Sequence, residues 1–178
     1  MKKILGLVFA LIALAAIAAY AQHGHTGKPE ANPPRANGGH IPPAPVARKD
    51  APAAREVEHD PAGHVNERPH VRNDKWYGHE APNDPRFHLD HPFEHGHFEH
   101  FGANYRYRVL RIDTNLHRFW FPGGFFFEVA AWDWAECADW CWTCGDDFVV
   151  YEDPDHVGWY MLYNVHTGVY VHVQYLGT

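Results

Sequence analysis

The stretch that decides the fold covers residues 148–176 and reads FVVYEDPDHVGWYMLYNVHTGVYVHVQYL. Three apolar segments, at 148–151, 159–164 and 169–176, are separated by the turn-forming sequences EDPDHVG and HTG. In the last segment the side chains alternate: one face carries Val169, Val171, Val173 and Tyr175, and the other carries Tyr170, His172 and Gln174. This alternation is typical of a half-buried antiparallel strand. The sequence therefore predicts a β-meander at its C-terminal end.

Further strands are predicted upstream at residues 105–113, 117–121 and 125–129. Residues 133–145 are predicted to form a short helix, because Asp133 and Glu136 have the spacing of a capping box and Gly145 suits a helix end. We expect a mainly β fold: a small antiparallel β-sheet domain, arranged as a meander, with a sandwich or a partial barrel as alternatives and with one short helix.

The composition divides the chain into three parts. Residues 1–21 resemble a signal peptide, residues 22–75 form a Pro/His/Ala-rich segment, and residues 76–178 hold all seven tryptophans. The middle segment has nine prolines and no Phe, Trp or Tyr, so it cannot bury enough apolar area to offset the entropy of ordering. We expect a disordered linker at 22–75 and an aromatic-rich β domain at 76–178.

The first 21 residues carry the features of a secretory signal. Lys2 and Lys3 precede a continuous apolar run at 4–19, and Ala19-Tyr20-Ala21 matches the small-x-small cleavage pattern. The apolar run is short for a membrane span, although a retained anchor is the alternative to cleavage. We therefore expect a secreted or periplasmic bacterial protein with no membrane span after cleavage.

The charge balance limits the partners. The chain has 22 Asp+Glu against 15 Lys+Arg, and its formal net charge is −7 with neutral histidines. Nucleic-acid binding depends on cationic contacts to phosphates, so this acidic balance argues against a nucleic-acid partner. An envelope component or a polysaccharide fits the expected export better. The aromatic surplus would suit a carbohydrate-binding module, although in so small a domain aromatics are expected mainly to fill the core.

Three cysteines stand close together at Cys137, Cys141 and Cys144. Over these eight residues the spacing resembles the cluster motif of the radical SAM enzymes, which implies an iron–sulfur cluster on a (β/α) barrel. The local pattern here is mostly β, and exported proteins usually pair neighbouring cysteines. We favour one disulfide plus one buried thiol and leave the pairing open. A thiol–disulfide oxidoreductase that uses Cys141 and Cys144, or a thiolate metal site, is the alternative.

A run of histidines supplies the candidate metal ligands. The sequence HLDHPFEHGHFEH contains His88, His91, His95, His97 and His100. Imidazole is a ligand of zinc, copper and nickel, and His-rich tracts indicate metal binding by composition. Pro92 and Gly96 interrupt any helix that would align these ligands, so a purely compositional surplus is the competing interpretation.

The sequence identifies no reaction. It contains no serine-nucleophile motif, no glycine-rich phosphate loop and no carboxylate pair whose spacing marks it as catalytic. We therefore expect a small exported binding or envelope-associated protein rather than an enzyme. Divalent metal is the most specific ligand that the sequence supports.

Overall fold

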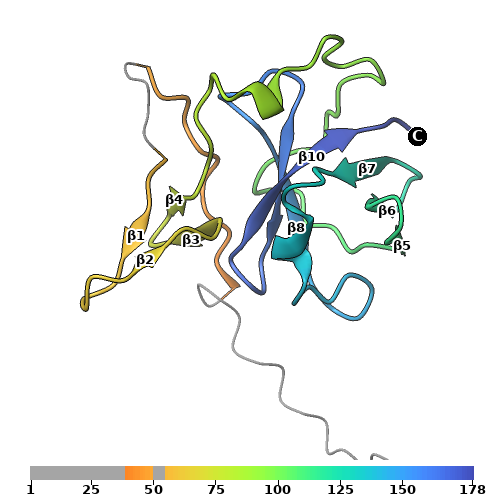
Figure 1. Cartoon of the computed structure of the whole chain (residues 1–178). Coiled ribbons are helices and arrows are strands. Elements are labelled where there is room, and N and C mark those ends of the chain that lie inside the picture. The colour runs from red at the N-terminus through yellow and green to blue at the C-terminus, as the bar shows by residue number, and fades with distance from the viewer. Residues whose placement is uncertain (1–38, 50–54) are drawn as a thin grey trace, which may run out of the picture. The chain divides into compact units, whose positions relative to one another are not determined.

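The computed structural model describes residues 39–49 and 55–178 and consists mainly of antiparallel strands (Figure 1). The strands are β1 (Glu58–His59), β2 (Val65–Asn66), β3 (His70–Arg72), β4 (Lys75–Tyr77), β5 (Arg111–Asp113), β6 (Arg118–Trp120), β7 (Phe126–Val129), β8 (Phe148–Glu152), β9 (Tyr160–Asn164) and β10 (Tyr170–Tyr175). The 3-10 helices η2 (Pro85–Phe87) and η3 (Trp134–Cys137) lie between strands. The predicted mainly β, antiparallel fold is confirmed.

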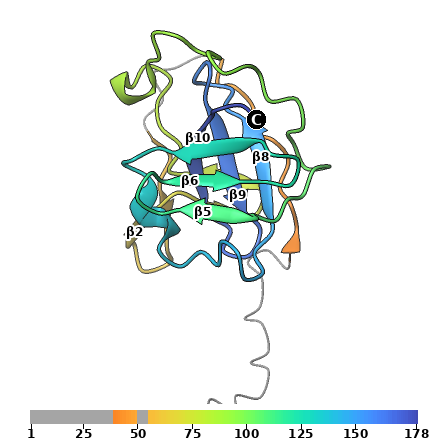
Figure 2. The same ribbon diagram turned by 90° about the vertical axis from the view of Figure 1, so that its right-hand side faces the viewer.

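The central sheet has the order β5-β6-β7-β10-β9-β8, and all its neighbouring strands are antiparallel. Strands β8, β9 and β10 form the predicted C-terminal meander. Figure 2 shows β5 and β6 running across β8 and β9. Just before β5, Tyr107 forms a bridge to Phe148 of β8, with two N–H···O bonds of 2.8 Å. The two edges of the sheet therefore approach each other, which is the geometry of a partial barrel.

The main core fills the space between these crossing strands. Its side chains are largely aromatic, and Phe119, Phe121, Phe127, Phe148 and Tyr160 are fully buried there. Aromatic rings bury large areas each, which allows a short chain to form an adequate core. Most of the aromatic surplus is thus accounted for by packing.

The opposite face of β8–β10 is also buried. Tyr151, Tyr163 and Tyr170 form a second core there, and the Trp76 ring lies 4.6 Å from that of Tyr170. The hairpin of β3 and β4 covers this face, and Val71 N of β3 donates to the Gly168 carbonyl at 2.7 Å. The expectation that the last strand is only half-buried is therefore wrong, because earlier parts of the chain cover its second face.

Residues 39–49, which we call the N-terminal arm, contribute to this cover. Ile41 packs against the second core, the Tyr151 hydroxyl donates to the Pro42 carbonyl, and the Trp76 indole N–H donates to the Pro43 carbonyl at 3.2 Å. The described part of the expected linker also holds β1, β2 and β3. The folded domain therefore begins before Trp76, the predicted boundary. The expected signal at 1–21 and residues 22–38 and 50–54 of the expected linker lie outside the described residues.

The helix predicted at 133–145 is reduced to the single turn of η3, followed by irregular turns. The Asp133 side chain makes no capping bond to η3 because its Oδ2 instead accepts from His172. Among the residues that the structure describes, no helix is long and apolar enough to cross a membrane.

Candidate metal centre

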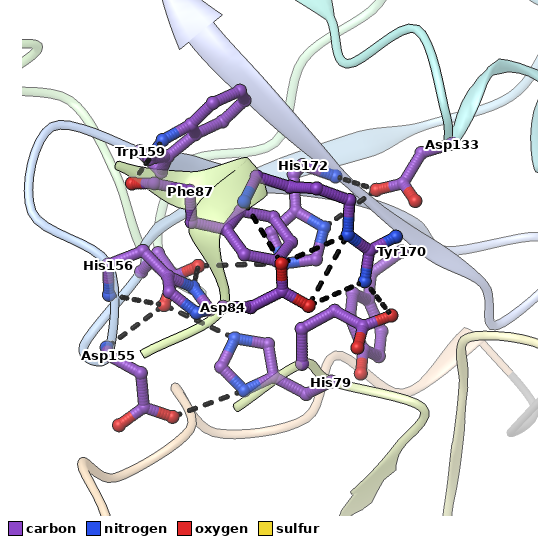
Figure 3. A network of polar contacts seen from close by, with 12 residues as sticks. His79, Asp84, Phe87, Asp133, Asp155, His156, Trp159, Tyr170 and His172 are labelled. Atoms are coloured by element: carbon purple, nitrogen blue, oxygen red, sulfur yellow. Dashed lines mark hydrogen bonds and ion pairs between the residues drawn. The ribbon is translucent and has the colours of Figure 1, made fainter. Parts of the chain in front are cut away.

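Three histidines, labelled in Figure 3, converge in the interior beside the second face of the sheet. One aspartate, Asp153, lies among them. One potential ligand atom from each of His79, Asp153, His156 and His172 lies within 4.8 Å of the other three. We call these four residues the His/Asp cluster. Their side chains are at most 6% exposed. Buried polar groups of this kind need partners, so the contacts of each ring nitrogen define what the cluster can bind.

His79 enters the cluster from the segment that follows β4. The preceding residue, Gly78, has φ +74°, and a Cβ atom there would lie 2.9 Å from the Pro69 Cα. Only glycine avoids that contact, so the chain can turn tightly at this point and place His79 inside. The Nδ1 of His79 lies 3.2 Å from Asp155 Oδ2, and its Nε2 lies 3.2 Å from Asp153 Oδ1.

Asp153 and His156 come from the loop between β8 and β9. Asp153 Oδ1 accepts the backbone N–H groups of Asp155 at 2.9 Å and His156 at 3.2 Å, which forms a tight turn of the kind that aspartate favours. Asp153 Oδ2 lies 2.6 Å from His156 Nδ1. The other nitrogen of His156, Nε2, donates to the Ala81 carbonyl at 2.9 Å.

His172 lies in the middle of β10, on the face opposite the main core. Its Nδ1 donates to Asp133 Oδ2 at 2.6 Å, and its backbone N–H donates to the same oxygen at 2.8 Å. Its Nε2 is buried and has no hydrogen-bond partner, and Asp153 Oδ2 lies 3.6 Å away. The Phe87 ring packs against both His156 and His172, at centroid distances of 4.0 Å and 4.4 Å.

A common pattern joins the three histidines. Each has an outer nitrogen next to a fixed acceptor: His79 to Asp155, His156 to Ala81 and His172 to Asp133. Each inner nitrogen faces Asp153. Outer hydrogen bonds to carboxylates and carbonyls fix the tautomer and ring orientation of metal-binding histidines in proteins. The inner nitrogens are therefore arranged as lone-pair donors around one carboxylate.

The contact between His156 and Asp153 is the most informative. Because the Ala81 carbonyl can only accept, His156 Nε2 carries a proton, and in a neutral ring Nδ1 would then be a lone pair. That lone pair would face a carboxylate oxygen at 2.6 Å. A proton must therefore lie between the two atoms, and a metal ion can take its place only if they move apart, because two ligands of one tetrahedral zinc ion lie roughly 3.4 Å from each other.

The electrostatics favour a cation. Burial acts to lower the pKa of His79, but hydrogen bonds to Asp153 and Asp155 outweigh it and raise the pKa to about 9. Burial acts to raise the pKa of Asp153, but its hydrogen bonds with His156 and His79 hold that pKa well below the ordinary value. In the metal-free protein a proton on His79 therefore pairs with these carboxylates, and a metal ion would displace it.

The donor set suits a metal ion by its chemistry, although the ligand atoms have to move. A tetrahedral zinc ion with bonds of about 2.0–2.1 Å needs ligand atoms roughly 3.4 Å apart. The ligand atoms lie as close as 2.6 Å and up to 4.8 Å from one another, so metal binding requires the side chains to shift to a common spacing. Three imidazoles and one carboxylate are ligands that zinc accepts, and copper and nickel also bind imidazole.

The histidines predicted as ligands lie elsewhere. His88, His91, His95, His97 and His100 are all exposed. His97 Nδ1 lies 3.1 Å from the Tyr160 hydroxyl, and His88 Nε2 lies 3.7 Å from Asp90 Oδ1. Within the described ranges, the one group of converging ligands is the His/Asp cluster, which contains none of these five. Metal binding by the histidine run stays a prediction.

The cysteines separate as one disulfide and one thiol. Cys141 and Cys144 form the disulfide, and Cys137 is a buried free thiol. Burial and the nearby Asp133 and Glu136 carboxylates raise the pKa of Cys137 far above its ordinary value. A thiol with a raised pKa is a poor nucleophile and a poor metal ligand. The arrangement agrees with the predicted disulfide plus buried thiol.

The sequence contains a local signal for the cluster, although it is weak. Asp153, Asp155 and His156 fall within four residues of a turn, and His172 interrupts an apolar strand. His79 and Asp133 are distant in sequence and carry no comparable signal.

No protein-family model, curated protein or solved structure matches the chain, so its function has to be argued from this geometry alone.

Proposed function

We propose that this protein binds one divalent transition-metal ion, zinc in the first place, through His79, Asp153, His156 and His172. The observation that carries the proposal is the orientation of the three rings. Their outer nitrogens are held by Asp155, Ala81 and Asp133, and their inner nitrogens surround Asp153. A cluster of this kind needs a cation, and its four protein ligands complete a tetrahedral coordination shell.

The donor chemistry sets the metal preference. Imidazole nitrogens suit zinc, copper and nickel, whereas calcium and magnesium prefer oxygen ligands. Since four protein ligands leave no position for water, the centre serves binding or stability rather than metal-assisted catalysis. The disulfide between Cys141 and Cys144 supports the proposal that the protein works outside the cytosol, because disulfides persist in oxidising compartments.

Titration of the metal-free full chain with zinc by calorimetry tests the proposal. We expect one zinc ion per chain with sub-micromolar affinity, and no comparable binding of magnesium. Asp153→Asn keeps the size of the side chain but removes the central negative charge, and should weaken zinc binding at least a hundredfold. The matched control is Asp90→Asn, because Asp90 has a side chain that is 88% exposed.

The same titration separates the two histidine groups. The double change His95→Ala and His97→Ala should leave the stoichiometry at one, because both side chains lie outside the cluster. If instead this double change removes binding and Asp153→Asn does not, the metal site is the exposed histidine run and the proposal is wrong.

A further inference from the structure

The ligands of the His/Asp cluster are sealed from solvent. His79, Asp153 and His172 expose 6% or less of their side chains. A metal ion can reach them only if some segment of the chain moves aside. The rate of metal exchange depends on which segment moves. This inference rests on the proposed metal-binding function.

Two cavities reach residues of the centre. One, of about 230 Å³, is lined by residues 43–46 and Arg48 of the N-terminal arm and reaches His79 and Asp155. The other is a groove of about 680 Å³ along residues 82–92, which reaches Asp155 and His156. Each is a candidate entry route, and the segments that cover them differ greatly in how firmly they are held.

The groove is walled by a well-packed element. Phe87 is 4% exposed, and its ring contacts two of the ligand rings, those of His156 and His172. The Trp159 indole N–H donates to the Phe87 carbonyl at 3.1 Å. Moving residues 82–92 would break the packing around His156 and His172, so entry through the groove would disturb the metal site itself.

The arm is held much more loosely over the other cavity. Most of residues 43–48 are exposed, and Val46 is 86% exposed. Pro42, Pro43 and Pro45 lack backbone N–H groups, so this part of the arm cannot form a continuous hydrogen-bond ladder with a strand. Beyond Pro43 the contacts include a long one with the centre, from Arg48 N to Asp155 Oδ1 at 3.4 Å, and a partly exposed ion pair between Arg48 Nη2 and Glu56 Oε2 at 3.6 Å.

That contact also joins the arm to the metal ligands. Asp155 Oδ1 faces Arg48 N, while Asp155 Oδ2 faces His79 Nδ1. The carboxylate that orients His79 is thus the one that the arm touches when it is docked. Ile41, packed against the second core, and the Pro42 and Pro43 carbonyls anchor the near end of this segment.

We propose that residues 43–48 form a strap over the metal centre, that the metal enters and leaves beneath this strap past His79 and Asp155, and that anchoring at Ile41 sets the rate of exchange. A loosened strap should speed both binding and release, because both steps pass through the same open state. The equilibrium affinity should change little, because the four ligands stay in place.

The test uses the full chain with Ile41→Ser, and Val46→Ser as the matched control in the same arm. Zinc release is followed by mixing the loaded protein with excess EDTA, and zinc binding by stopped-flow mixing with the metal-free protein. Ile41→Ser removes a partly buried apolar side chain, so we expect release and binding each to accelerate about fivefold. The dissociation constant should stay within about twofold, and Val46→Ser should exchange zinc at the wild-type rate.

Release from Ile41→Ser at the wild-type rate overturns the strap. Acceleration by Phe87→Leu without acceleration by Ile41→Ser also overturns it and moves the route to the groove. A dissociation constant that rises in step with the release rate would mean that the arm stabilises the bound state rather than gating it. If the wild-type chain binds no zinc at all, the proposed function itself fails, and this result is distinct from the others.

Discussion

Binding of zinc to the His/Asp cluster should raise the melting temperature of the protein by a predictable amount. A ligand that binds only the folded form at a free concentration of 100 Kd adds about 2.7 kcal/mol to the free energy of unfolding. The described domain has about 135 residues, so its unfolding entropy near the melting temperature is about 280 cal/mol/K. The expected increase in melting temperature is therefore about 10 °C.

The variant that removes this increase is His172→Gln. Glutamine can still donate a hydrogen bond toward Asp133, but it offers no imidazole Nε2 to the centre. In its metal-free form the variant should fold and keep the antiparallel sheet. The fully buried Val171 and Val173 on either side of residue 172 still hold β10 in place. Zinc should raise its melting temperature by less than about 3 °C, because the remaining ligands bind the ion only weakly.

Differential scanning calorimetry with and without zinc, at several zinc concentrations, measures both values. The matched control is His88→Gln, because the His88 side chain is 80% exposed and belongs to the histidine run. It should keep the full increase. A full zinc-dependent increase in His172→Gln, or its loss in His88→Gln, would refute the assignment of the metal to the buried cluster.

Three further outcomes follow from the structure. The folded-state pKa of His79 is about 9, above its ordinary value of 6.5, so its contribution to the stability of the metal-free protein is complete below pH 6.5 and is lost as the pH rises through 9. Urea unfolding in EDTA should show that the free energy of unfolding decreases by up to about 3 kcal/mol over this pH range, and that His79→Gln removes this dependence. Cys137 should react with iodoacetamide far more slowly in the native protein than after unfolding. Thiol counting without reductant should find one free thiol per chain, and three free thiols would contradict the disulfide. Gly158→Ala should destabilise the fold by about 1–3 kcal/mol in urea unfolding, because Gly158 has φ +85° and a Cβ there would lie 2.7 Å from the Pro92 Cβ; an unchanged midpoint would show that the loop relaxes.

Strands β6 to β10 were predictable because their signal is local, whereas β1, β2 and β3 lie in the segment that was expected to be a disordered linker. Alternation and turn residues at 148–176 predict β8, β9 and β10 to within about a residue, and the runs near 118 and 126 predict β6 and β7. The helix prediction at 133–145 fails for a reason that lies far away in the sequence. Asp133 binds His172, a residue 39 positions later, and so does not cap the turn that follows it.

The His/Asp cluster was not predictable for the same reason. Its residues at 79, 153, 156 and 172 are brought together by strand pairing and by the cover over the second face of the sheet. Histidine density directed attention to residues 88–100, which are close in sequence but exposed and do not converge. Density along the chain measures composition, whereas a buried site depends on contacts between distant segments.

The burial of both faces of β8, β9 and β10 also determines which piece of the chain can fold independently. A fragment starting at Trp76 would keep all six strands of the central sheet, but it would lose β3 and the N-terminal arm. Tyr151 and Tyr163, buried in the whole protein, would then face water as part of an apolar surface, and such surfaces promote self-association. The proline-rich arm and β3 together therefore keep aromatic surface of the sheet away from water, and we expect a shortened version that starts after Ile41 to self-associate more readily than one that keeps this cover.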